Sequence, residues 1–163
     1  MSARVSSPCR FTWLARLSIV LSAIAAAACG VTGPSGRHAG EQARLDQARA
    51  QWRAQGIADY TYVFSRGCFC VEEAREPVTI TVRGGAIASV VSVAGGAPRD
   101  PAQYTTVEGL FDLVQDAIDQ DAATIRTEYD PARGYLASAW LDISERLADE
   151  EISVEARSLT PLN

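Results

Sequence analysis

Two cysteines one residue apart, Cys68 and Cys70, are the residues whose types and spacing most directly suggest chemistry. In an oxidising compartment such a pair normally forms a disulfide. Fully extended backbone would place their Cα atoms about 6.6 Å apart, near the upper limit for a disulfide, so we expect a bend, which Gly67 would permit. Because the bond would close a very small loop, we expect it to add little stability.

Two chemical alternatives compete with this structural interpretation of the cysteine pair. One is a reactive dithiol, and the other is a metal site that adds Glu72 and Glu73 to the thiols. The redox motif of thioredoxin-like proteins separates its cysteines by two residues rather than one. Two thiolates also fall short of the four ligands of a structural zinc. A disulfide that fixes a bend is therefore the preferred interpretation, with thiol redox function as the alternative.

The remaining acidic and histidine residues form no recognisable catalytic pattern. Acidic side chains gather at Asp142 and at residues 149–151, where we expect a solvated turn, because the alternating oxygens and glycine of a calcium loop are absent. Paired glycosidase carboxylates would need two acids to face each other, and the sequence identifies no such pair. The only histidine, His38, lies in a stretch rich in Gly, Pro and Ser, so we expect it to be solvated. We predict no enzyme activity, no cofactor and no metal site.

A third cysteine, Cys29, follows a segment that has the composition of a secretory signal. Arg4, Arg10 and Arg16 precede a run of apolar and small residues at 17–28, which is too short to span a bilayer. The Ala-Ala-Ala-Cys junction at 26–29 resembles the lipobox of bacterial lipoproteins. That resemblance implies acyl chains, palmitate among them, at Cys29, and Gly30 in place of aspartate implies the outer membrane, facing the periplasm. The alternative is an ordinary signal cleavage near Ala28 that leaves a soluble secreted protein.

These features divide the chain into a signal peptide at 1–28, a lipid-anchored flexible linker at 29–40 and a single domain at 41–163. Removal of the signal leaves 135 of the 163 residues, with 12 arginines, 20 acidic residues, no lysine and a net charge of −8. This length suits one domain with a core. An acidic chain without a basic stripe excludes nucleic acid as a partner. The expected partners are the membrane, through Cys29, and another protein of the envelope.

Two segments have the periodicity of amphipathic helices. Residues 41–55 carry Leu45, Ala48 and Trp52 at helical spacing and stop near Gly56. The second helix follows a capping box formed by Thr105 and Glu108. Its apolar stripe consists of Val107, Leu110, Phe111, Val114 and Ile118.

Six segments alternate between apolar and polar residues and are expected to be strands. They cover residues 59–70, 77–82, 86–93, 123–129, 135–143 and 151–158. We predict an α+β fold, with an antiparallel sheet of about six strands and two helices on one face; a tandem helix-plus-three-strands arrangement is one option. The open face would carry Thr61, Thr79, Thr81, Arg83, Thr124, Arg126 and Glu128.

A set of aromatic, cysteine and turn residues resembles an uncharacterised family of small bacterial lipoproteins, classified only as a domain of unknown function. The set comprises Trp52, Tyr60, Tyr62, Cys68, Cys70, the Gly84-Gly85 hairpin, Tyr129, Asp130, Gly134, Tyr135 and Asp142. The resemblance covers most of residues 41–158 and implies no activity. We therefore expect a non-catalytic envelope lipoprotein that binds another envelope or secreted protein.

Overall fold

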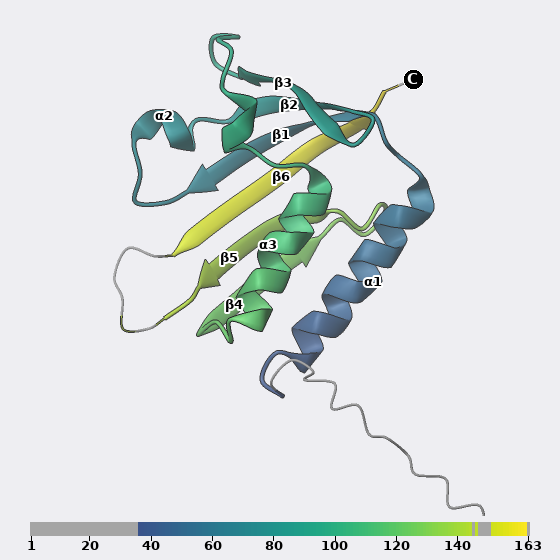
Figure 1. Cartoon of the computed structure of the whole chain (residues 1–163), viewed down its shortest axis with the longest axis vertical. Coiled ribbons are helices and arrows are strands. Elements are labelled where there is room, and N and C mark those ends of the chain that lie inside the picture. The colour runs from purple at the N-terminus through teal and green to yellow at the C-terminus, as the bar shows by residue number, and fades with distance from the viewer. Residues whose placement is uncertain (1–35, 145, 147–150, 163) are drawn as a thin grey trace, which may run out of the picture. The chain divides into compact units, whose positions relative to one another are not determined.

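The computed structural model describes residues 36–144, 146 and 151–162 (Figure 1). The predicted signal peptide at 1–28, Cys29 and most of the predicted linker lie outside these residues. The first helix, α1 (Ala39–Gln55), begins two residues before the predicted domain start and ends at Gly56, which has a positive φ of 63°. A left-handed residue of this kind ends many helices, and glycine adopts that conformation without steric cost.

The six strands lie at or close to their predicted positions. Their bounds are β1 (Tyr60–Gly67), β2 (Val78–Arg83), β3 (Ala86–Ser92), β4 (Thr124–Tyr129), β5 (Leu136–Asp142) and β6 (Ile152–Pro161). They form one sheet in the order β3-β2-β1-β6-β5-β4, and each neighbouring pair is antiparallel. The predicted α+β fold with a six-stranded antiparallel sheet is confirmed.

Helices α1 and α3 (Val107–Asp119) lie side by side over one face of this sheet (Figure 1). The predicted stripe on α3 is buried throughout, with Phe111 at 2% exposure and Val114 at 0%. On the strands, alternate side chains such as Tyr60, Tyr62 and Phe64 of β1 point into the same core. The core therefore fills the space between two helices and one sheet face. No helix in the described part of the chain is long and apolar enough to span a bilayer.

The start of α3 differs from the predicted capping box by one residue. The N-cap is Thr106, whose hydroxyl accepts a hydrogen bond from the Gly109 N–H. The Glu108 carboxylate does not complete the predicted capping box. It instead accepts hydrogen bonds from the Trp52 indole N–H at 2.7 Å and the Tyr60 hydroxyl at 3.1 Å. A tertiary contact thus replaces the local one because aromatic donors from α1 and β1 reach this carboxylate.

Two short helices interrupt the predicted pattern. They are α2 (Glu72–Arg75), which follows the cysteine pair, and the 3-10 helix η1 (Pro101–Gln103), which precedes α3. Neither contains a buried residue. Without a buried apolar face, such segments give no periodic signal in the sequence.

Apart from these short helices, the order of a helix followed by three strands occurs twice, as predicted. The strands of both sets follow the same spatial order across the sheet, β3-β2-β1 and then β6-β5-β4. Because β1 and β6 are antiparallel, each strand of the second set runs opposite to its counterpart in the first. With both helices on the same face, no rotation superposes one set on the other. The repeat is therefore one of element order and not of a superposable unit.

Candidate functional site

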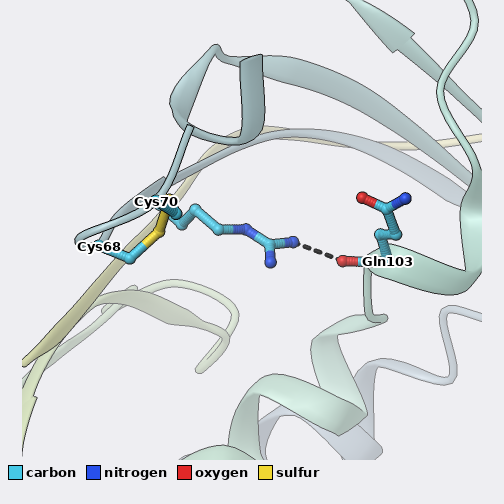
Figure 2. The surroundings of a disulfide bond; sticks show 4 residues. Cys68, Cys70 and Gln103 are labelled. Atoms are coloured by element: carbon cyan, nitrogen blue, oxygen red, sulfur yellow. Dashed lines mark hydrogen bonds between the residues drawn. A yellow bond between two sulfur atoms is a disulfide. The ribbon is translucent and has the colours of Figure 1, made fainter. Parts of the chain in front are cut away.

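The cysteine pair lies just beyond the end of β1, not within the strand as predicted. The strand ends at Gly67, and the chain bends through Cys68, Phe69 and Cys70. The two sulfur atoms are joined as a disulfide, with Cα atoms 5.2 Å apart. Figure 2 shows this bond, with Gln103 of η1 across from it. This separation is shorter than extended backbone allows, so the expected bend is present, one residue after the expected glycine.

Gly67 faces a neighbouring strand closely. It pairs with Ser153 of β6, and a Cβ atom at Gly67 would collide with the Ser153 hydroxyl. Its φ is not positive, so it does not make the bend. A side chain at position 67 would therefore require the Ser153 hydroxyl to rotate away.

The tip of the molecule, defined here as Cys68–Val71, presents apolar side chains to solvent. Phe69 is 85% exposed and Val71 is 71% exposed, the two highest values among the large hydrophobic residues that the structure describes. The following helix α2 has no buried residue that would draw the tip into the core. The bond between Cys68 and Cys70 therefore holds a small loop that contributes no side chain to the core.

The metal alternative for this region is not assembled. Glu73 forms an ion pair with Arg99 at 3.1 Å, and Glu76 binds the same guanidinium at 2.7 Å. Both sulfur atoms are occupied by their mutual bond. Within the described ranges, no group of three or more His, Cys, Asp and Glu side chains is arranged to hold a metal ion.

The predicted acidic cluster is only partly described by the structure. Asp142 ends β5 and is half-buried, and Glu151 is exposed just before β6. Asp149 and Glu150 lie outside the described residues. Asp142 and Glu151 are thus the two members of the predicted cluster whose positions the structure describes.

His38 is the clearest error of the sequence interpretation. It was expected to be a solvated linker residue, but it is 6% exposed and precedes the first residue of α1. Its Nε2 lies 2.9 Å from the backbone carbonyl of Ala122, just beyond α3. The contact joins residues 84 apart in sequence, so the local composition could not reveal it.

The outer face of the sheet carries the polar residues predicted for it. Arg83, Arg126 and Glu128 are exposed, and the four predicted threonines are half-buried. Trp140 of β5, which the sequence analysis did not single out, lies on this face with the Arg126 guanidinium 5.1 Å from its ring centroid. The alternation within residues 135–143 places Trp140 opposite to the buried Ala139 and Leu141, and that signal was available.

Most residues of the family-like pattern hold elements together. The Tyr62 hydroxyl donates to the Thr105 carbonyl ahead of α3, in addition to the Trp52 and Tyr60 contacts with Glu108. Asp130 accepts hydrogen bonds from the N–H groups of Ala132 and Arg133, which closes the β4–β5 turn. This turn rests on α1. Cys68 and Cys70 have a different role, because they close the loop that exposes Phe69.

A protein-family model described as "Family of unknown function (DUF6174)" matches residues 44–161. The chain belongs to DUF6174. The match begins inside α1 and ends with β6, so the DUF6174 region contains the whole sheet, most of α1, all of α3 and the tip. The expected membership of a family without known function is confirmed, and no curated protein matches this chain.

Proposed function

We propose that this protein is a non-catalytic lipoprotein of the cell envelope, anchored by acyl chains at Cys29, whose tip binds another envelope or secreted protein. The signal-like segment ahead of Cys29 supports the anchoring, together with the small residues at 26–28. A diacylated or triacylated cysteine would hold the chain stably, because one acyl chain alone gives only marginal membrane binding. The Gly30 residue supports the outer membrane as the location, with the domain facing the periplasm.

The observation that carries the binding role is the exposure of Phe69 within a covalently closed loop. An aromatic ring left 85% in water contributes little to folding, and large aromatic residues dominate the energetics of protein interfaces. The Cys68–Cys70 bond restricts the loop before any partner arrives, which lowers the entropy lost on binding. Val71, two residues further along the chain, is also exposed, at 71%.

Site-specific photocrosslinking tests this role in the intact envelope. A photoreactive phenylalanine analogue at position 69 should give a discrete adduct of defined mass with one partner. The matched control places the same analogue at position 93, because Val93 is also apolar and exposed but lies outside the tip. Phe69→Ala should weaken binding of the partner so identified by about 2 kcal/mol or more, as expected of a central aromatic contact. Equal adducts from both positions, or none from position 69, would exclude the tip as the interface.

A second candidate function, thiol redox chemistry, is favoured by the position of the disulfide on a surface bend where both cysteines are half-buried. A catalytic disulfide should have a reduction potential above the roughly −300 mV below which structural disulfides of secreted proteins lie. A redox titration of the full chain decides between the two. Under the binding role, changing both cysteines to serine should leave a folded domain with a modest loss of stability, because the closed loop is tiny.

A further inference from the structure

A pocket of about 380 Å³ lies between η1, residues 109–116 of α3 and the adjoining ends of β1 and β6. This volume falls within the range of small-molecule sites in proteins. Its apolar wall is formed by Phe64, Tyr104, Leu110, Leu113, Ile152 and Val154. Phe69 does not line it, so the pocket is independent of the proposed protein contact.

Arg66 is the cation of this pocket, and none of the carboxylates that the structure describes pairs with its charge. Its guanidinium lies over the rings of Phe64 and Tyr104, with centroids at 5.3 and 5.1 Å. One terminal nitrogen donates to the Gln103 carbonyl at 2.5 Å, and Figure 2 draws this bond as the dashed line ending at Gln103. The Nε atom is buried without a hydrogen-bond partner, and no carboxylate of the described residues lies within 4.0 Å of this guanidinium.

Arg99 provides the internal comparison for this unpaired charge. Its Nε is also buried without a partner, but its terminal nitrogens bind the carboxylates of Glu73 and Glu76. A partly buried guanidinium is stabilised by such pairing, and its planar fork matches a carboxylate. Arg66 likewise has a buried Nε without a hydrogen-bond partner. It differs from Arg99 because no described carboxylate pairs with it, and because it lines the pocket.

The charges at the pocket rim restrict the kind of anion that would fit. Asp112 and Asp116 of α3 line the rim; Asp112 binds the Arg49 guanidinium at 2.8 Å. Two nearby carboxylates repel a multiply charged anion such as phosphate far more than a single negative charge. We propose that the pocket binds an apolar monocarboxylate, with its carboxylate on Arg66 and its apolar body along the wall. Either an acyl carboxylate or the free C-terminus of a peptide that ends in an apolar residue has this chemistry.

Nuclear magnetic resonance titration of the purified full chain, without detergent, tests the site with octanoate as the probe. Saturable shifts are expected at Leu113 and Ile152. Uncharged 1-octanol and cationic octylamine should each bind at least tenfold more weakly than octanoate. A short peptide ending in leucine, compared with its C-terminal amide, distinguishes the peptide source: only if the free acid binds as tightly as octanoate is the peptide the preferred ligand.

Substitutions then assign the carboxylate to Arg66. Arg66→Gln should weaken octanoate binding at least tenfold, and Arg66→Lys less so, whereas Arg157→Gln should have no effect. Arg157 is the matched control because it is an exposed arginine paired with Glu155 on β6, outside the pocket lining. Unchanged affinity in Arg66→Gln, equal binding of octanol, or shifts confined to residues outside the pocket would overturn the proposal. Should Arg66→Gln fail to fold, the comparison of octanoate with octanol on the unaltered chain still decides.

Discussion

At the scale of single residues, Glu108 is an example of a side chain whose partners the sequence could not supply. A spacing of three residues from Thr105 indicates a local cap, and the helix does begin there within one residue. The donors that actually reach its carboxylate, Trp52 and Tyr60, lie 56 and 48 residues away. Burial raises the pKa of the Tyr60 phenol, and the neighbouring Glu108 charge adds to the effect. The sequence showed that these residues can form hydrogen bonds, but only the folded structure shows which of them pair over 48 or 56 positions.

Gly134 in the β4–β5 turn is required by both its backbone and its surroundings. Its φ is 81°, and a Cβ atom would lie 2.7 Å from the Ala48 carbonyl of α1. Gly134→Ala should therefore lower the free energy of unfolding by about 1–3 kcal/mol or more, as expected of backbone strain, which chemical denaturation would measure. Gly95→Ala is the matched control, because that glycine has no positive φ and a Cβ atom there would meet no other atom within 4 Å. Equal losses at both positions would contradict the packing described.

Asp59 links the start of β1 to the β2–β3 turn. Its interactions predict that the stability of the fold depends on pH in the acid range. The Gly84 N–H at 2.7 Å, and then the Arg83 side chain, hold the pKa of this carboxyl below its ordinary value of 3.8. Since the folded-state pKa is the lower one, the carboxylate stabilises the fold above pH 3.8 and that contribution is lost as the pH falls through the folded-state pKa.

The measurement is unfolding as a function of pH, combined with titration of the Asp59 side chain by nuclear magnetic resonance. Asp59→Asn should abolish this part of the acid dependence. Arg83→Gln should reduce it while leaving the larger contribution of the Gly84 hydrogen bond. An Asp59 carboxyl that titrates at its ordinary pKa would show that the turn contact does not persist in solution.

At the scale of elements, the buried face of α3 gives the sharpest stability prediction. Phe111 is 2% exposed and stacks on Tyr129 with ring centroids 6.4 Å apart. Phe111→Ala should cost about 3–5 kcal/mol, because a large buried ring is replaced by a cavity. Leu113→Ala on the same helix should cost clearly less, because Leu113 is only partly buried. Denaturant unfolding of both variants measures the difference, and similar losses would mean that the buried face has been misassigned.

The positions of the long helices and the strands could largely be predicted from the sequence, for a physical reason. A sheet with one buried and one open face imposes alternation, which residues 77–82 show strictly and residues 86–93, across the Gly-Gly turn and a register shift, show in part. Alternation continued through Cys68 and Cys70, so the predicted strand ran three residues too far. The end of β1 is set instead by the bend at the disulfide, which hydrophobic periodicity does not encode. The bend expected at Cys68 and Cys70 is present, but the exposure of Phe69 between them was not predicted.

At the scale of the whole molecule, the proposed anchor predicts where the protein is found. Cys29 lies outside the residues that the structure describes, so this prediction depends on the sequence alone. Wild-type protein should sediment with membranes and carry acyl mass on the peptide that begins at Cys29, whereas Cys29→Ser should be released or remain unprocessed. Fractionation and mass spectrometry provide the measurement. A soluble wild-type protein without acyl mass would exclude the anchor.

The order of strands was the part of the architecture that local patterns could not predict. Six alternating runs are compatible with several antiparallel orders, and short connections favour simple neighbours. The pairing of β1 with β6 depends instead on contacts such as Phe64 with Ala156 and Gly67 with Ser153, which lie about 90 residues apart in the chain. It is this pairing that joins the two three-stranded halves.

That central pair has a consequence for when the protein can fold. β6 is the last of the six strands to be synthesised, and it lies between β1 and β5. Until residues 152–161 have left the ribosome, the early hairpins have no strand to connect them, and pairing over such long sequence separations is slow. A nascent chain of this topology therefore stays open until β6 has been synthesised. For a protein with the proposed export signal, that delay favours translocation across a membrane as an unfolded polypeptide.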